Sequence, residues 1–539
     1  MTTVPTPTTV GESQARTDPS SSSGSTTTAT TTTRAVRGID PKALDVLLSD
    51  ELSKLSVNDR EAFQEQLHGI TNGLSSSVQE TPELLEGALN LMAYELDFFI
   101  KPMNKRSYIE AITQYPDTTF VRSNDFRLRF LRCEQFDVKK AANRMCRYLD
   151  LVNDVFGTDL LQRPVMMKDV TTNAEEVELI RSGIYSLLPS KDRAGRRIFA
   201  SVGNLSMTYS LLARVKLTIY MFWIATEDVE AQRNGLVIVM WPSPDCFALK
   251  VSETSGGGSH IDSFDIEKDK EKAEKYFQSE DEDDDGEKSV RSAGFSSVTG
   301  SKLHFAAAKL FSSLPVRVVG HHCCGFPDTP VFQLVKGLVV LGLGKQRSTV
   351  RFHSGSSTEI SYKLLSFGIP AELVPMTDTG NVKNKNQLHW MTIRKTLENP
   401  KNSVVGEPAA MPIEVPLSYD VQFRFGQPYP AHRGNIAYRE IVTARYDRHR
   451  SANNDEKLAI TWEIVEEVER RGRFLTWDRK NSYWIDINNR ETKRSKVATS
   501  FKEHGRRLRA QANLQTSQSC SKSIGPAWKK QKCDGGLSN

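Results

Sequence analysis

The chain has 539 residues, with 71 Lys and Arg against 66 Asp and Glu and a hydrophobic content of 38%. This length exceeds what one core accommodates, so two or three domains are expected. No apolar run approaches the roughly 18–20 residues that span a bilayer, and seven scattered cysteines favour a reducing compartment over a disulfide framework. With no secretory h-region after Met1, we expect a cytoplasmic protein.

Helical signals follow a Thr/Ser-rich segment, residues 1–38, that we expect to be disordered. The signals cover residues 80–160. Thr81 and Pro82 form a typical helix N-terminus. Asp137 is the predicted N-cap of a longer helix, in which apolar residues recur at steps of four and three until a glycine ends the pattern. The sequence therefore predicts an all-α lead-in.

An α/β pattern occupies residues 175–395. Strand-like runs at 184–188 and 197–202 flank a turn signal at 192–195, which predicts a strand pair. A long apolar helix is expected over 206–230, followed by an Asn-Gly turn and a buried strand.

An insertion, residues 252–300, interrupts this domain with a glycine run and the acidic run 280–287. Its composition cannot offset the entropy of ordering, so we expect it to be disordered. The acidic run is typical of a solvated linker. The alternative is that it masks basic parts of the chain.

The stretch 314–375 has the most informative pattern. A strand at 316–319 leads through His321-His-Cys-Cys324 into a Pro-bearing loop. A very apolar helix, 331–343, then precedes a strand at 348–353. Strand, helix and strand form a βαβ unit, which predicts a parallel sheet. A helix that is apolar on several faces must cover something on both sides, as a lid over a pocket does.

We interpret residues 331–343 as a gate helix, whose terminal glycines can absorb backbone rotation. Apolar side chains that it exposes on opening are worth roughly 1.5–3 kcal/mol each when buried in a membrane surface. The alternative is a core helix that does not move. The predicted membrane-gate residues are Val331, Phe332, Leu338, Gly342, Leu343 and Gly344.

The same stretch supplies the predicted ligand contacts. Lys336 is the single charge within the gate helix, and a buried ammonium needs a partner. The alternative is a lysine that extends to solvent. The predicted ligand-binding residues are Phe332, Val335, Lys336, Val339, Arg351 and His353.

No catalytic, cofactor or metal signature stands out. Neighbours on a strand alternate faces, so His321 to Cys324 cannot converge on one ion, and no second ligand pair has zinc-finger spacing. Gly342-Leu-Gly-Lys345 lacks Walker spacing, and no Gly-x-Ser-x-Gly elbow occurs. We therefore expect no enzyme, no cofactor and no metal.

A basic C-terminal module, residues 424–512, follows a linker at 397–423. Between Arg424 and Arg509 there are 20 Lys and Arg against 12 Asp and Glu, a net charge of +8. We expect a disordered tail at 513–539. The predicted elements of the module are helices at 435–450 and 454–471, a hairpin at 474–477 and 483–487, and a basic helix at 493–509.

The partner of this module is open. Positive charge beside Trp477, Tyr483 and Trp484 fits single-stranded nucleic acid, but aromatic residues in a hairpin usually form its core. The glutamates interleaved over 463–469 also weaken a phosphate footprint. We rank contact with a protein or membrane surface above nucleic acid, which is not the expected partner.

Several motifs resemble one known family. The run Arg127-Leu-Arg-Phe-Leu-Arg-Cys-Glu-Gln-Phe-Asp-Val-Lys-Lys-Ala141 closely resembles the N-terminal helical signature of CRAL-TRIO proteins, the cellular retinaldehyde-binding and phosphatidylinositol-transfer family. Asp192 to Ile198 looks like its strand pair, and Asn234 to Val239 looks like its central strand. The stretch 314–375 resembles its gate region and last strand.

The resemblance covers about residues 85–395. It implies an α/β sandwich with a mostly parallel sheet as the floor of a lipid-sized cavity, and a gate helix that opens at the membrane. Members use basic residues near Lys336 for lipid phosphate. The strand end Met240-Trp241 lacks the family's aspartate, which puts the ligand in doubt. Residues 426–510 look like an uncharacterised domain of many diatom proteins, which implies no mechanism.

We therefore expect non-enzymatic binding, and transfer or presentation between membranes, of a lipid or other small hydrophobic ligand. Phosphoinositide, sterol, carotenoid and tocopherol all fit an apolar cavity. Membrane association is expected to be transient. The alternative is a scaffold or regulatory protein that acts through residues 424–512, by binding protein or nucleic acid.

Overall fold

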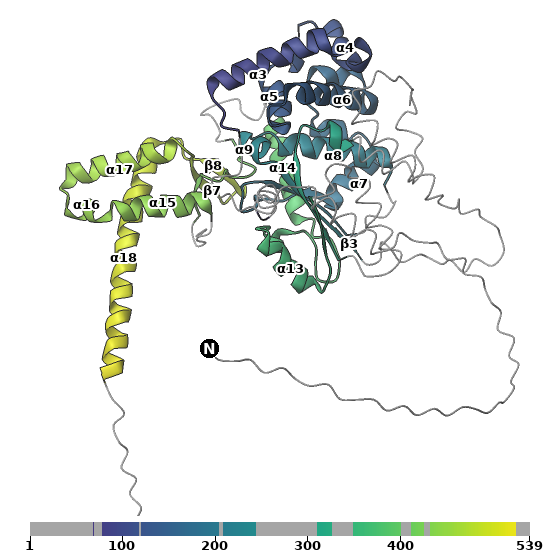
Figure 1. The fold of residues 1–539 in the computed structure, drawn as a ribbon. Helices are drawn as coiled ribbons and strands as arrows, with labels where there is room; N and C mark the ends of the chain where they lie inside the picture. The colour runs from purple at the N-terminus through teal and green to yellow at the C-terminus, as the bar shows by residue number, and fades with distance from the viewer. Residues whose placement is uncertain are drawn as a thin grey trace, which may run out of the picture.

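The computed structural model describes residue 68 and residues 78–117, 120–203, 209–243, 310–325, 349–399, 411–424 and 432–523. They form a mixed α/β structure in which a helical region precedes a five-stranded sheet, and a module with a three-stranded sheet follows (Figure 1). The segments 1–38 and 252–300, expected to be disordered, and the gate helix lie outside the described residues.

The helical lead-in is confirmed, together with its two predicted N-caps. The Thr81 side chain accepts a hydrogen bond from the Leu84 amide, and the Asp137 carboxylate accepts one from the Lys140 amide. The elements are α3 (Pro82–Tyr94), η1 (Glu95–Phe99), η2 (Pro102–Asn104), α4 (Arg106–Gln114), η3 (Phe120–Arg122), α5 (Asn124–Cys133), α6 (Val138–Phe156), η4 (Thr158–Gln162) and η5 (Met167–Val170).

The five strands lie in the sheet in the same order as in the chain. The first pair is antiparallel and the other three are parallel, which confirms the predicted strand pair and parallel sheet. The strands are β1 (Tyr185–Leu187), β2 (Arg197–Gly203), β3 (Leu236–Pro242), β4 (Val318–Cys324) and β5 (Val350–His353).

Helices cover both faces of this sheet (Figure 1). One core joins the sheet to α8 and continues to α5 and α6, whereas a smaller core lies between the sheet and α13. The flanking elements are α7 (Ala174–Ser182), α8 (Leu211–Ala225), α9 (Val229–Asn234), α13 (Ser357–Ser366), η8 (Ala371–Leu373) and α14 (Lys385–Glu398).

Two boundaries in this domain differ from the prediction. The expected helix at 206–230 is α8 followed by α9, because the Asp228 carboxylate accepts a hydrogen bond from the Ala231 amide and starts a new helix. The strand expected at 316–319 begins at Val318 and continues through the two histidines to Cys324. The His-His-Cys-Cys run therefore lies within a strand.

The C-terminal module packs three helices against the first turns of a fourth, and its hairpin faces α14 (Figure 1). The strand β6 lies parallel to β7, and β7 and β8 form the predicted antiparallel hairpin. The elements are β6 (Val421–Phe423), α15 (Arg433–Ala444), α16 (Tyr446–Ser451), α17 (Asn454–Glu469), β7 (Phe474–Asp478), β8 (Tyr483–Asp486) and α18 (Arg490–Ser523).

Two predictions for the module are wrong in detail. The helix expected at 435–450 is divided at Arg445 into α15 and α16. The last helix does not end near residue 509 but extends to Ser523, into the segment expected to be disordered. No Gly or Pro interrupts the sequence between Gly505 and Gly525, which allows the helix to continue. Within the described ranges, no helix combines the length and the apolar character that crossing a membrane requires.

Candidate functional site

A row of five side chains crosses the large sheet on the face that packs against α8. The register pairs Tyr185 with Ser201, Ser201 with Met240, Met240 with Cys323, and Cys323 with Phe352. Paired residues of neighbouring strands project to the same face. We call these five residues the transverse row, and each strand contributes one of them.

The transverse row is mostly apolar, with Ser201 as its one hydroxyl-bearing aliphatic side chain, and it is incompletely covered. Tyr185, Met240 and Phe352 are partly exposed although they lie on the helix-covered face of the sheet. At the start of α8, Leu211 and Leu212 are also partly exposed and pack against the same core. Protein interiors are normally close-packed, so this strip of large apolar side chains is a candidate surface for an apolar ligand.

A buried histidine lies one step from the row, on the same face. His321 occupies the position two residues before Cys323, and its Nδ1 lies 2.9 Å from Thr349 Oγ1. Its Nε2 is buried and has no hydrogen-bond partner among the described residues. Burial lowers the pKa of His321 to about 3, so the ring is neutral at physiological pH. A hydroxyl or carbonyl group is the chemistry that would satisfy such a nitrogen.

The cysteines of this strand have no features of a nucleophile or metal ligand. Cys323 and Cys324 are fully buried, and burial raises the pKa of Cys323 to about 12. The reactive form of cysteine is the thiolate, which this environment disfavours. In the parts of the chain that the structure describes, no three His, Cys, Asp or Glu side chains are placed to hold a metal ion.

The two described residues of the predicted ligand site lie on the opposite face of the sheet. Arg351 pairs with His322, and His353 pairs with Cys324, so neither belongs to the transverse row. His353 Nε2 lies 2.9 Å from His322 Nδ1. Both rings contact Phe367, which follows α13. The other predicted ligand and gate residues, all within 331–344, lie outside the described residues.

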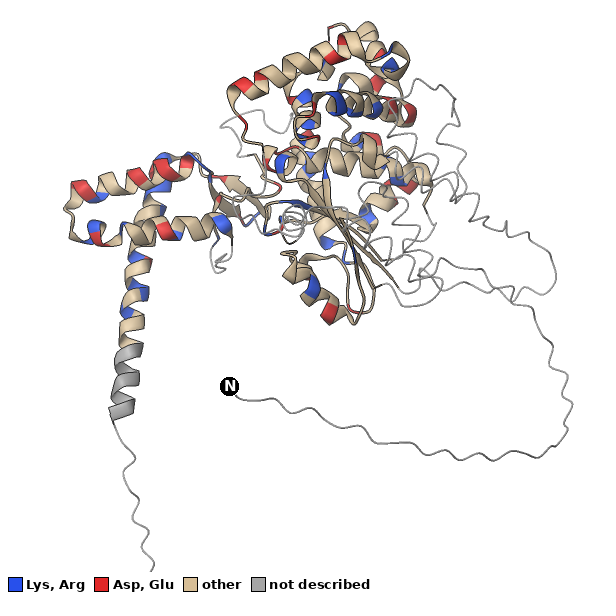
Figure 2. Ribbon diagram, viewed as in Figure 1, with Lys and Arg blue, Asp and Glu red and all other residues tan. Residues whose placement is uncertain are grey.

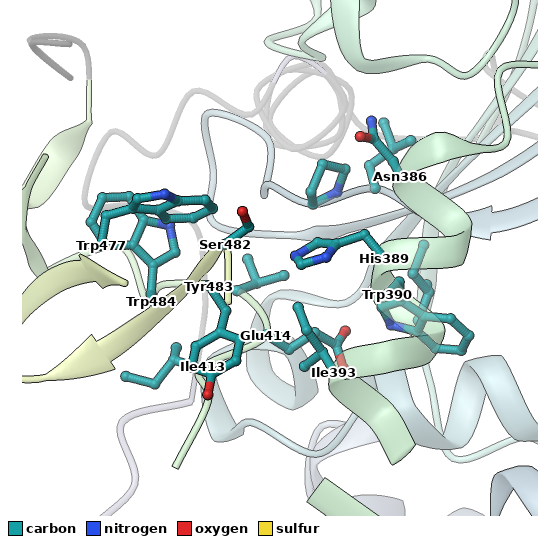
Figure 3. Close-up of a pocket in the computed structure, with 14 residues that line it drawn as sticks. Asn386, His389, Trp390, Ile393, Ile413, Glu414, Trp477, Ser482, Tyr483 and Trp484 are labelled. Carbon is teal, nitrogen blue, oxygen red and sulfur yellow. The ribbon is translucent and has the colours of Figure 1, made fainter. Parts of the chain in front are cut away.

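A second candidate site lies at the junction between the sheet domain and the C-terminal module. The lining comes from the end of β1, from α14, from the linker and from the β7–β8 hairpin. Figure 3 shows His389 pointing from α14 toward Ser482 and the hairpin tryptophans, whereas Trp390 points away from them. The lining residues are Leu187, Leu188, Pro189, Asn386, His389, Trp390, Ile393, Ile413, Glu414, Val415, Trp477, Ser482, Tyr483 and Trp484.

This junction pocket is too small for a lipid. Its volume is about 70 Å³, whereas sites for drug-sized ligands enclose about 300–1,000 Å³. Trp477 and Trp484 meet edge to face at 5.1 Å, and the Arg424 guanidinium stacks on Trp477 at 4.2 Å. The pocket can therefore hold a few water molecules or one small apolar group.

Buried ion pairs lie against the junction pocket. Glu414 bonds Arg197 of β2 and Arg394 of α14, and Arg394 also pairs with Glu227 and Glu398. Burial alone would raise the pKa of Glu414, but the two arginines outweigh burial and lower it. The carboxylate is therefore ionised at neutral pH, and it tethers a segment that the sequence predicted to be a linker.

Sequence reasoning missed both groupings for different reasons. The transverse row depends on which residues of neighbouring strands are paired. Alternation along a strand shows which residues share a face, but it does not determine this register. The junction pocket brings together four segments between residues 187 and 484. The signal that was present is the tryptophan content of the hairpin, which we interpreted as a hairpin core.

Comparison with known proteins covers only the C-terminal module. No curated protein matches the chain. Residues 420–503 match the family model described as a domain of unknown function (DUF6824). The match begins at Asp420, whose carboxylate accepts hydrogen bonds from Arg473, and includes all of β6 to β8. These residues are similar to a family that has no assigned activity.

Proposed function

We propose that the sheet domain binds one lipid or other small hydrophobic molecule against the transverse row, without catalysis, and transfers or presents it at membranes. The observation that carries the proposal is the set of large apolar side chains, Tyr185, Met240 and Phe352, left partly exposed on the α8 face. The resemblance to CRAL-TRIO proteins supports the same function, since it implies a mostly parallel sheet as the floor of a lipid-sized cavity.

The chemistry of the strip favours binding over reaction. Apolar area removed from water is worth roughly 25 cal/mol per Å², so a ligand that covers these side chains gains affinity without charged contacts. Among the described residues, the polar groups nearby are Ser201, the neutral His321 and Arg214, whose side chain hydrogen-bonds Tyr185 at one end of the row. This composition, mostly apolar with a small number of polar groups, is typical of small-molecule sites.

Membrane contact belongs to the same proposal. A carrier must reach a bilayer to load and release its ligand, and the gate residues predicted within 331–344 are the proposed contact. Arg351 is no longer a proposed ligand contact, because it projects to the α13 face. Phe352, its neighbour in β5, takes that place.

Native mass spectrometry of the full chain, followed by organic extraction, tests the proposal. We expect one bound lipid-sized mass per chain, either as purified or after incubation with mixed-lipid vesicles. Met240→Trp adds bulk to the middle of the transverse row, and should raise the dissociation constant of the ligand about tenfold, which corresponds to about 1.4 kcal/mol.

The matched control is Leu365→Trp, an equal increase in size on α13 at a side chain that is 46% exposed, on the other side of the sheet. The control should bind as the unmodified chain does. A chain that stays empty after incubation with vesicles, or one in which Met240→Trp binds as well as Leu365→Trp, would contradict binding at the transverse row.

A further inference from the structure

The last helix of the module projects away from the rest of the protein. α18 spans Arg490–Ser523, about 51 Å at 1.5 Å per residue. Its first turns pack through Val497 and Phe501, which are buried, and Gly505 lies against Tyr446. From Arg506 to Asn513 every side chain is exposed. Figure 1 shows this part of α18 extending beyond α15, α16 and α17.

The projecting part, taken with Lys502, carries four cations against one acid, Glu503. Lys502, Arg506 and Arg509 are spaced four and three residues apart, so they lie along one face of the helix. Arg507 adds a cation about 100° around the helix from Arg506. Glu503 is the single acidic residue between Lys502 and Ser523. Figure 2 shows Lys and Arg along this part of the helix.

The glutamates that counted against a phosphate-binding footprint lie elsewhere and are already paired. They belong to α17, where Glu463 pairs with Arg448 and Glu467 pairs with Arg445. Glu469 pairs with Lys493, at the opposite end of α18 from the projecting part. These acids therefore offset cations inside the module, and the projecting helix keeps a net positive charge that Glu503 offsets only in part.

The shape of the helix decides between two anionic partners. Insertion into a bilayer surface requires an apolar face, and Leu508 is the one large apolar side chain between Arg506 and Asn513. The major groove of B-form DNA, by contrast, admits a single α-helix and presents phosphates along both walls. A stripe of three cations with a fourth to the side fits two walls of phosphate better than a flat surface.

We propose that the exposed end of α18 is a docking surface for double-stranded DNA, with Lys502, Arg506, Arg507 and Arg509 contacting phosphates. Binding is electrostatic and not specific for base sequence, because the proposed contacts are to phosphates, which are the same at every base pair. The nucleic acid partner that the sequence left as the least favoured becomes the favoured partner of this module. The proposal is independent of ligand binding in the sheet domain.

Salt dependence provides the test, measured by fluorescence anisotropy with the full chain and a labelled 30-base-pair duplex. Each phosphate contact contributes about −0.9 to the slope of log K against log salt concentration. R506A/R507A/R509A should weaken binding about tenfold or more near 100 mM salt, and should make the slope shallower by about 2.7. Alanine favours helix and all three positions are exposed, so the fold is retained.

The matched control, R470A/R471A/K480A, removes three exposed cations from the other end of the module. It should change the slope by less than one unit if those residues do not contact DNA. Equal slopes for R506A/R507A/R509A and the unmodified chain would overturn the proposal. It would also be overturned if that variant lost binding to vesicles of phosphatidylcholine and phosphatidylserine but kept its affinity for DNA.

Discussion

At the scale of single residues, the best-defined feature of the sheet domain is a pair of histidines buried on its α13 face. His322 and His353 stack with their ring planes 6° apart and share a hydrogen bond. Burial lowers the pKa of His353 to about 4, and it lowers the pKa of His322 well below its usual value. Both rings are neutral in the folded protein, and they help to form the core under Phe367.

This pair predicts acid sensitivity of the fold. The unfolded chain takes up protons on these histidines below about pH 6.5, whereas the folded protein does not until about pH 4. The stability that depends on these two neutral histidines is therefore fully present above about pH 6.5, and it is lost as the pH falls toward 4. His353→Gln, which can keep the hydrogen bond, should remove about 1–2 kcal/mol of the loss between pH 7 and pH 5.

Urea unfolding of the full chain at the two pH values measures this difference. If the free energy of unfolding fell by the same amount from pH 7 to pH 5 in the unmodified chain and in His353→Gln, the pKa of His353 would not differ between the folded and unfolded states. Glu80 is a useful reference, because its ion pairs with Arg132 and Arg233 hold its pKa near 2 despite burial. Its carboxylate stays ionised in the folded protein at both pH 7 and pH 5, so Glu80 adds almost nothing to the difference in stability between them.

The residue scale also shows what sequence reasoning could determine about the site. Alternation along β5 places Arg351 and His353 on one face and Phe352 on the other, and the sequence contains this fact. It does not contain which face meets α8, because that depends on how β5 pairs with β4 and on where α8, more than a hundred residues earlier in the chain, packs on the sheet. The choice of Arg351 and His353 therefore rested on residue type, and register now favours Phe352.

At the scale of elements, the small sheet of the module depends on two glycines. A side chain at Gly434 would lie 2.2 Å from the carbonyl oxygen of Asp420, and one at Gly472 would lie 2.3 Å from that of Tyr419. Both glycines pack closely against the backbone just before β6. The sequence did not predict this strand. A strand of three residues leaves little periodic signal, so its position follows from this close packing.

Gly472→Ala should therefore destabilise the module by about 1–3 kcal/mol, because the new methyl group meets backbone that cannot move cheaply. Gly87→Ala is the matched control, since nothing lies within 4 Å of a side chain at that position of α3. It should stabilise the protein by about 0.5–1 kcal/mol through helix propensity.

Thermal unfolding of the two variants gives the comparison, and opposite shifts in melting temperature are expected. Equal shifts would mean that β6 relaxes away from Gly472.

The predicted helices with clear caps, at Thr81 and Asp137, have the predicted starts. Two expected helices, 206–230 and 435–450, are instead broken near Asp228 and Arg445, where no Gly or Pro marks the break in the sequence.

At the scale of the whole molecule, the sheet domain and the module are joined through Glu414. Its carboxylate bonds arginines from β2 and α14, and Ile413 forms a backbone bridge to Trp484 of the hairpin. A second link joins Glu230 of α9 to the Ser418 amide. The segment predicted as a linker is thus part of a polar interface.

Glu414→Ala should weaken this interface strongly. It leaves Arg197 and Arg394, each less than 5% exposed, without one partner, and removing one member of a buried ion pair costs about 3–5 kcal/mol. We expect calorimetry to show one unfolding transition in the unmodified chain and two in the variant, with the module separate from the sheet domain.

The control is Glu466→Ala, which removes a carboxylate that is 66% exposed and 3.8 Å from Arg490. Exposed pairs of this kind contribute about 0–1 kcal/mol, so a single transition should persist. Two transitions in the unmodified chain would mean that the interface does not couple the two units.

The order of the strands has a consequence for how the protein is made. Each strand of the large sheet pairs with the strand synthesised just before it, so the sheet can extend as the chain emerges. Arg197 of β2 is the exception, because its partner Glu414 follows 217 residues later. At about 5–20 residues per second, that delay lasts roughly 10–40 s. During this interval Arg197 lacks the carboxylate that it pairs with in the folded protein, so the sheet domain can form its strand pairs before it can complete this ion pair.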